Sequence, residues 1–136
     1  MVKTKLKFYR LMYSMTPPDV IVLTPPKNGA FADTLRWLRS RGFRLQPADS
    51  QALESVLRQH RKAPLLIYSP PNGAPAADVV LRAASAIHGR PVLVAVDSSD
   101  FGSYYDLMAL GVNGYYEVSE GPESIGRALQ HFSASA

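Results

Sequence analysis

The groups in this chain that could do chemistry are a serine and two aspartates that follow apolar runs. Ser69 closes the run Leu-Leu-Ile-Tyr at residues 65–68, and Asp97 and Asp100 follow the run Val-Leu-Val-Ala-Val at residues 92–96. A serine hydroxyl can act as a nucleophile, and paired carboxylates can hold a hard cation such as Mg²⁺. Each run predicts a strand buried on both faces, so these groups would lie at the carboxyl end of a parallel sheet, where ligands bind.

Neither kind of group has the neighbours that such chemistry requires. No Gly-x-Ser-x-Gly elbow surrounds Ser69, so the sequence does not favour a serine hydrolase. Asp97 and Asp100 flank two serines in one loop, which is more typical of helix capping than of a cation site. The histidines fall on or beside predicted helices without metal-ligand spacing; they are His60, His88 and His131. We therefore expect no catalytic residue, no metal and no cofactor.

The loops after the first and third predicted strands lack a phosphate-binding pattern. Residues 24–29 read Thr-Pro-Pro-Lys-Asn-Gly, which fits neither the P-loop nor the dinucleotide-binding motif. Prolines have no backbone N–H with which to hold an anion. In the later loop, Asn72 and Gly73 predict a turn rather than a phosphate site.

Five strands alternate with five helices along the chain. The strands are expected at residues 19–23, 43–46, 64–69, 91–96 and 114–118, and the helices at 30–41, 49–60, 76–88, 101–110 and 121–132. Strict alternation predicts an α/β fold, a (βα)5 doubly wound parallel sheet. The first, third and fourth strands are apolar throughout and should be central, whereas the second and fifth carry polar residues and should be edges. The order 2-1-3-4-5 satisfies all five assignments.

The totals indicate one domain of ordinary globular composition. The chain has 136 residues and no cysteine, so disulfides and thiolate chemistry are excluded and a cytoplasmic location is expected. No apolar run approaches the roughly 18 residues of a membrane span.

The basic character of the chain is concentrated in its first residues. The net charge is +4, and from residue 15 onward eleven basic residues balance eleven acidic ones; the leader's basic residues are Lys3, Lys5, Lys7 and Arg10. We expect residues 1–18 to be a basic leader outside the fold, disordered or non-native with Met15 as the start, and residues 19–136 to be the domain. The alternatives are an arm that contacts a membrane surface or an acidic partner, or an added ordered element. A neutral domain argues against contact with nucleic acid.

Residues 19–136 resemble a response-regulator receiver (CheY-like) domain. The segment Gly-Val-Asn-Gly-Tyr-Tyr-Glu-Val-Ser-Glu-Gly-Pro-Glu-Ser-Ile at residues 111–125 is similar to the family's Gly-Ala-x-Gly-Tyr-Leu-x-Lys-x-x-x-Pro-Glu-x-Leu. The segment Pro-Val-Leu-Val-Ala-Val-Asp at residues 91–97 is similar to the family's fourth strand. The resemblance implies a flavodoxin-like fold and a role in two-component signal transduction.

The positions that carry phosphoryl chemistry in receivers hold other residues here. The paired acids that bind Mg²⁺ match Thr24, Pro25 and Pro26, and the phospho-accepting aspartate matches Ser69, or Pro70 if the register shifts by one. The switch Ser/Thr matches Val96, and the lysine at the end of the fifth strand matches Val118. Since phosphoryl transfer depends on such charges, the resemblance is to an atypical pseudo-receiver that keeps the fold without the phosphorelay.

Tyrosines gather on the fourth helix and fifth strand. Tyr115 matches the switch aromatic of receivers, and Tyr104, Tyr105 and Tyr116 lie nearby in the sequence. In each adjacent pair one side chain tends to face outward, and tyrosine is enriched at protein interfaces. In receivers the surface of the fourth helix, fifth strand and fifth helix is the usual dimer or partner face, which makes these tyrosines candidates for an interaction surface.

The resulting hypothesis is a regulatory domain that is independent of phosphorylation and acts by binding protein, through homodimerisation at this face. One alternative is a flavodoxin-like domain that binds a small molecule at the strand ends. Another is the N-terminal part of a response-regulator transcription factor without its output domain. A third is a conventional receiver whose acceptor is displaced to Asp97 or Asp100.

Overall fold

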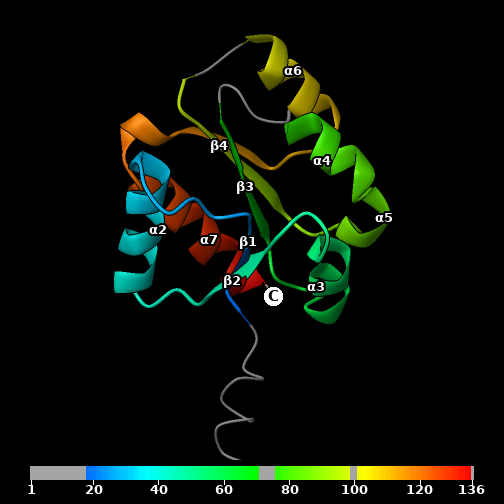
Figure 1. The fold of residues 1–136 in the computed structure, drawn as a ribbon, viewed down its shortest axis with the longest axis horizontal. Helices are drawn as coiled ribbons and strands as arrows, with labels where there is room; N and C mark the ends of the chain where they lie inside the picture. Colours follow the sequence, from blue (N-terminus) through cyan, green and yellow to red (C-terminus); the bar gives the residue numbers. More distant parts are fainter. Residues whose placement is uncertain (1–17, 71–75, 99–100, 136) are drawn as a thin grey trace, which may run out of the picture.

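The computed structural model describes residues 18–70, 76–98 and 101–135 of the chain. Its centre is a parallel sheet in the order β2-β1-β3-β4-β5, as the distribution of apolar residues predicts (Figure 1). The strands are β1 (Val20–Leu23), β2 (Leu45–Ala48), β3 (Leu65–Ser69), β4 (Val92–Val96) and β5 (Gly114–Glu117). Every residue of β1 and β4 is buried, which explains why these strands show no polar alternation.

Helices cover both faces of the sheet. The α-helices are α2 (Ala30–Ser40), α3 (Leu53–Gln59), α4 (Ala76–Arg82), α5 (Ala84–Ile87), α6 (Phe101–Ala109) and α7 (Glu123–Ser135), and a short 3-10 helix, η1, spans Val118–Glu120. Helices α2 and α7 lie on one face, and α3, α4, α5 and α6 lie on the other (Figure 1). The result is the three-layer arrangement of a doubly wound α/β domain.

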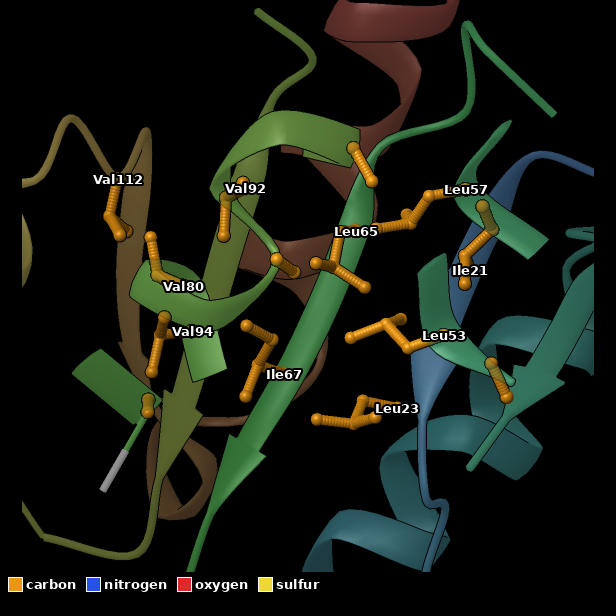
Figure 2. Close-up of a cluster of buried hydrophobic side chains, with 14 of the residues drawn as sticks. Ile21, Leu23, Leu53, Leu57, Leu65, Ile67, Val80, Val92, Val94 and Val112 are labelled. Atoms are coloured by element: carbon orange, nitrogen blue, oxygen red, sulfur yellow. The ribbon is translucent and has the colours of Figure 1, made fainter. Parts of the chain in front are cut away.

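Alternate residues of each central strand supply the two cores. Ile21, Leu65 and Val94 point to the face covered by α3, α4, α5 and α6, where Leu53, Leu57 and Val80 pack against them (Figure 2). Val22, Leu66 and Leu93 point to the other face, toward Phe31 and Leu35 of α2 and Leu129 of α7. Period-two alternation therefore divides each apolar run between two cores.

Helices α2 and α7 approach closely at a glycine. A Cβ atom placed on Gly126 would lie 3.0 Å from Cζ3 and 3.3 Å from Cη2 of Trp37, so only a residue without a side chain fits without a shift. The guanidinium of Arg41 lies 4.9 Å above the centre of the Trp37 ring, which covers the ring with a cation.

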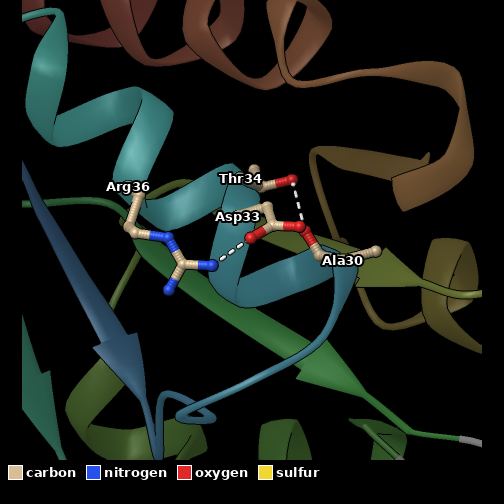
Figure 3. A network of polar contacts seen from close by, with 4 residues as sticks. All are labelled: Ala30, Asp33, Thr34 and Arg36. Atoms are coloured by element: carbon tan, nitrogen blue, oxygen red, sulfur yellow. Dashed lines mark hydrogen bonds and ion pairs between the residues drawn. The ribbon is translucent and has the colours of Figure 1, made fainter.

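Helix α2 begins and ends as its sequence predicts. Near its start Asp33 pairs with Arg36, and the buried Thr34 hydroxyl donates a 3.2 Å hydrogen bond to the Ala30 carbonyl (Figure 3). At its end Gly42 adopts a φ of 92°, and the Phe43 N–H donates to the Leu38 carbonyl at 3.1 Å. A glycine in this left-handed conformation is a common way for a helix to end.

A buried arginine joins the ends of two helices. Arg90 is only 7% exposed and faces backbone carbonyls rather than a carboxylate. Its Nη1 donates to His60 and Ala63 at 2.9 and 3.0 Å, and its Nη2 donates to Leu57 at 2.5 Å. Further bonds run to the carbonyls of Ala86 and Ile87 in α5. Burial lowers the pKa of the Arg90 guanidinium.

Several element boundaries differ from the sequence prediction; the helix expected at residues 49–60, for example, begins only at Leu53. The second strand was expected at residues 43–46 but spans Leu45–Ala48, because the capping turn after α2 uses Phe43. The helix expected at residues 76–88 is broken at Ala83 into α4 and α5, just before the carbonyls that bind Arg90. Val118, expected in the fifth strand, opens η1 instead. The predictions for residues 1–17, for Asn72 and Gly73, and for Asp100 lie outside the described residues.

Candidate functional site

The loop after β1 reaches the carboxyl end of the sheet without an acidic side chain. Thr24 is exposed and has a φ of 41°, an unfavourable left-handed conformation for a β-branched residue. Its backbone N–H donates a 2.6 Å hydrogen bond to the Ala48 carbonyl, which ties this turn to β2. Pro25 and Pro26 follow, half-buried. The positions where a receiver holds Mg²⁺ therefore offer no carboxylate and two fewer N–H groups.

The ends of β3, β4 and β5 are mostly apolar. Ser69 is half-buried and pairs in register with Val96, which is 6% exposed. Val118, the residue that matches the receiver lysine, is also 6% exposed and belongs to the core beside α2 and α7. The hydroxyl of Ser69 thus has apolar residues at the two positions where a switch hydroxyl and a lysine would stand. A phosphoryl group on Ser69 would meet no compensating charge from either of them.

A tyrosine and an aspartate meet at the same end of the sheet. Tyr68 Oη donates a 2.7 Å hydrogen bond to Oδ2 of Asp97, across 29 positions of sequence. The Tyr68 ring stacks on Phe31 with centroids 4.7 Å apart and an 8° angle between planes. Burial, then the hydrogen bond and the charge of Asp97, raises the pKa of Tyr68 to about 12. Tyr68 therefore stays protonated at neutral pH and acts as a donor.

This pair changes the interpretation of Asp97. The sequence suggested a helix cap or a cation ligand, and the structure adds that the carboxylate accepts a hydrogen bond from Tyr68 of β3. Sequence reasoning missed Tyr68, although it is the one aromatic residue of β3. Within residues 18–70, 76–98 and 101–135, no three acidic or histidine side chains gather closely enough to hold a metal ion.

The candidate tyrosines divide between exposed and packed positions. Tyr104 and Tyr105 on α6 are 39% and 67% exposed, so both members of the helical pair face solvent, not just one. Tyr115 is half-buried on the α6 side of the sheet, and its ring meets Tyr104 edge to face at a centroid distance of 5.4 Å. Tyr116 points to the opposite face. Helix α6 therefore presents its aromatic residues as a surface continuous with β5.

Tyr116 is held against its own strand. A Cβ atom on Gly114 would lie 2.5 Å from Tyr116 Oη, so the Tyr116 side chain occupies the space above this glycine. Burial raises the pKa of Tyr116. Its packing against the α2 and α7 core makes Tyr116 mainly a structural residue, whereas Tyr105 is the most exposed of the four.

Further exposed apolar residues extend the surface along α6. Met108 is 41% exposed and Leu110, just after the helix, is 36% exposed. With Tyr104 and Tyr105 they form what we call the α6 face, consisting of Tyr104, Tyr105, Met108 and Leu110. Among the described residues, the other large exposed apolar side chain is Leu81 on α4. No helix in the described part of the chain is long and apolar enough to span a bilayer.

Solved structures with this fold include receiver domains and a pilus assembly-related protein. The signal receiver domain of the response regulator NarL from Mycobacterium tuberculosis aligns with a TM-score of 0.67 and 16% identity, covering 88% of this chain and 98% of that one. The chemotaxis protein CheY4 from Vibrio cholerae aligns with a TM-score of 0.57 and 16% identity, covering 83% and 96%. A pilus assembly-related protein from Burkholderia pseudomallei aligns with a TM-score of 0.61 and 15% identity, covering 85% and 88%.

These likenesses establish the CheY-like, flavodoxin-like fold. At such identities they do not extend to chemistry, which has to be inferred from the side chains of this chain. The sequence matches no protein-family model and no curated protein sequence.

Proposed function

We propose that this chain is a pseudo-receiver, a regulatory domain that works without phosphorylation and acts by binding protein. The observation that carries the proposal is the chemistry at the carboxyl end of the sheet. Prolines stand where Mg²⁺ ligands would lie, and buried valines stand at the switch and lysine positions. Asp97, an acid at this end, is engaged by Tyr68. This arrangement supports a domain that acts through the binding of protein to its surface rather than through phosphoryl transfer.

The proposed working surface is the α6 face together with β5 and α7. Tyr104, Tyr105 and Met108 are large, exposed and share one side of α6, and Leu110 follows directly after the helix, which distinguishes them from apolar residues scattered singly over a surface. Tyrosine and methionine are enriched at protein interfaces, where they combine a large contact area with adaptable packing. We propose self-association through this surface, in a cytoplasmic protein.

The acceptor chemistry is tested by an amide NMR titration with Mg²⁺ and beryllofluoride, a mimic of aspartyl phosphate. We expect no saturable shifts at the amides of Thr24, Lys27, Asn28 and Ser69, or at those of residues 96–98. Saturable shifts there would mean that Asp97 leaves Tyr68 and joins a working acidic pocket, and the conventional receiver with a displaced acceptor would replace the pseudo-receiver. Full-length CheY-like protein with its acidic site intact serves as the positive control.

The interaction surface is tested by sedimentation velocity over a range of concentrations. We expect the wild-type chain to dimerise and Tyr105→Asp to weaken the association by at least tenfold, because a buried unpaired carboxylate costs several kcal/mol. The matched control is Leu81→Asp, which puts the same charge at an apolar residue 59% exposed on α4, outside the face. Equal effects of the two variants, or a wild-type monomer at every concentration, would contradict dimerisation through α6.

A second candidate function is that of one domain in a larger regulator or assembly protein. Two solved structures with this fold are described as pilus assembly proteins, from Burkholderia pseudomallei and, as CpaE2, from Sinorhizobium meliloti. In that case the α6 face would bind another domain or subunit instead of a second copy. A monomer whose α6 amides shift only when a partner domain is present would favour this candidate.

A further inference from the structure

The neutral domain consists of two oppositely charged halves. Residues 19–90 contain ten basic and five acidic residues, a net charge of +5, whereas residues 91–136 contain one basic and six acidic residues, a net charge of −5. The strand order places the strands of the two halves on opposite sides of the sheet, because β2, β1 and β3 come from the first half and β4 and β5 from the second, although α4 of the first half contacts α6 and α7 of the second packs beside α2. The domain therefore has a basic β2 side and an acidic β5 side.

The α6 face lies on the acidic side. From Pro91 to Gly126 the chain has no lysine or arginine. Asp106 is exposed on α6 itself, the half-buried Glu117 ends β5, and Glu120 is exposed at the end of η1. Asp106 on α6 and Glu117, which shares the α6 side of β5 with Tyr115, thus add negative charge near the exposed apolar residues of α6, whereas Glu120 lies in η1, which contacts α2 on the other face. Such a surface is suited to an occupant that is both apolar and cationic.

The first residues of this chain have the complementary composition. Residues 3–13 carry four basic residues and no acid, and they interleave these with six large apolar or aromatic residues: Leu6, Phe8, Tyr9, Leu11, Met12 and Tyr13. A neutral domain offered no obvious acidic partner for such a leader, but the acidic β5 side does. The charge distribution therefore favours the interpretation of the leader as an arm that binds an acidic surface.

We propose that residues 3–13 dock on the α6 face of the same molecule. The basic residues would pair with the acidic residues near this face, and the apolar residues would cover Tyr105, Met108 and Leu110. This proposal deepens the proposed function, since it rests on the same face and makes the leader a competitor of any partner that binds there.

The leader is long enough to reach this face. All five strands run parallel, so Pro18, just before β1, lies at the same end of the sheet as the turn from α6 into β5. Three strand spacings separate β1 from β5, or roughly 14 Å. The chain can span about 3.3 Å per residue, so even the five residues from 13 to 18 reach roughly 16 Å. The tether gives an effective concentration in the millimolar range, which favours the leader of the same molecule over that of a second copy.

The absence of cysteine permits a direct test by paramagnetic relaxation. The full chain carrying Val2→Cys is labelled with a nitroxide, and amide peak intensities are compared with those of the reduced label. We expect the amides of residues 103–117 to lose more peak intensity than the amides of α3. Helix α3 lies on the basic side and serves as the reference. Neutralising the leader with Lys3→Gln, Lys5→Gln, Lys7→Gln and Arg10→Gln should restore the intensities, as should about 0.5 M salt, where the screening length falls to roughly 4 Å.

Two comparisons complete the test. Asp106→Lys should restore the α6 intensities, whereas Asp78→Lys on α4 should not. Uniform broadening over the domain, or broadening that survives neutralisation of the leader, would overturn the proposal. A mixed sample contains ¹⁵N-labelled chain without the nitroxide and ¹⁴N chain that carries it. Broadening seen only in this mixture would place the leader on a second copy of the chain and would also overturn the proposal.

Sedimentation velocity then separates this proposal from the proposed function. If the leader docks and the face is also a dimer surface, the neutralised leader should strengthen self-association. Docking without any change in self-association would leave the leader contact intact and refute dimerisation at the α6 face.

Discussion

Replacing Arg90 should destabilise the whole domain, although its side chain touches no other side-chain charge. The guanidinium donates to carbonyls from the end of α3, from the approach to β3 and from α5. Arg90→Met keeps much of the apolar volume but removes every donor. The carbonyls of Leu57 and Ala63 then lose a charged donor in buried surroundings.

The expected loss follows from these two carbonyls. An unsatisfied buried polar group costs about 1–3 kcal/mol, so two of them cost about 2–6 kcal/mol. The wild-type arginine also bears a desolvation cost, visible in its lowered pKa, which the methionine avoids. We therefore expect Arg90→Met to lower the free energy of unfolding by about 3 kcal/mol. Arg90→Lys should cost about 2 kcal/mol, because a single ammonium cannot reach both helices as the planar fork does.

Urea denaturation followed by the fluorescence of Trp37, the single tryptophan, measures these differences. Arg82→Met is the control, since Arg82 is exposed on α4 and its loss should change stability by less than about 0.5 kcal/mol. If Arg90→Met unfolds within about 0.5 kcal/mol of wild type, Arg90 does not hold α3 and α5 together and the reasoning fails. An Arg90→Lys variant as stable as wild type would show that the planar guanidinium is not needed to bind the carbonyls of both helices.

The remaining predictions concern packing, proton linkage and backbone strain. Gly126→Val should push α7 away from Trp37 and destabilise the domain by about 2 kcal/mol in the same urea assay, whereas Gln130→Val, exposed on α7, should cost little. The pKa of Tyr68 is raised from about 10 to about 12, so its contribution to stability is complete below pH 10 and is lost as the pH rises toward 12. The difference between the alkaline absorbance titrations of wild type and Tyr68→Phe should therefore have a midpoint near 12, and a midpoint near 10 would refute the hydrogen bond to Asp97. Thr24→Asn should stabilise by up to about 1 kcal/mol, since asparagine tolerates the φ of 41°; a loss of stability would show that the Thr24 side chain outweighs the strain.

The sequence by itself determined the fold of this protein. The uninterrupted apolar runs of β1, β3 and β4 identified the central strands, because only a strand covered on both faces tolerates such a run. The polar residues of β2 and β5 identified the edges, and alternation with helices required parallel pairing. The lack of an acidic residue in the loop at residues 24–29 was also evident without coordinates. These features depend on local composition and periodicity, which a sequence contains in full.

Only the tertiary structure decided which distant side chains meet. Tyr68 and Asp97 are 29 positions apart, and Arg90 reaches carbonyls as far as 33 positions away, so no local pattern could pair them. The sequence gives the domain no net charge, yet the strand order places the strands of its basic and acidic halves on opposite sides of the sheet. The tyrosines of α6 were visible as residues, but their exposure depends on how α6 packs against the sheet. These contacts, charges and exposures all depend on the three-dimensional path of the chain. Folding brings together residues that are far apart in the sequence, and local sequence patterns carry no information about such pairs.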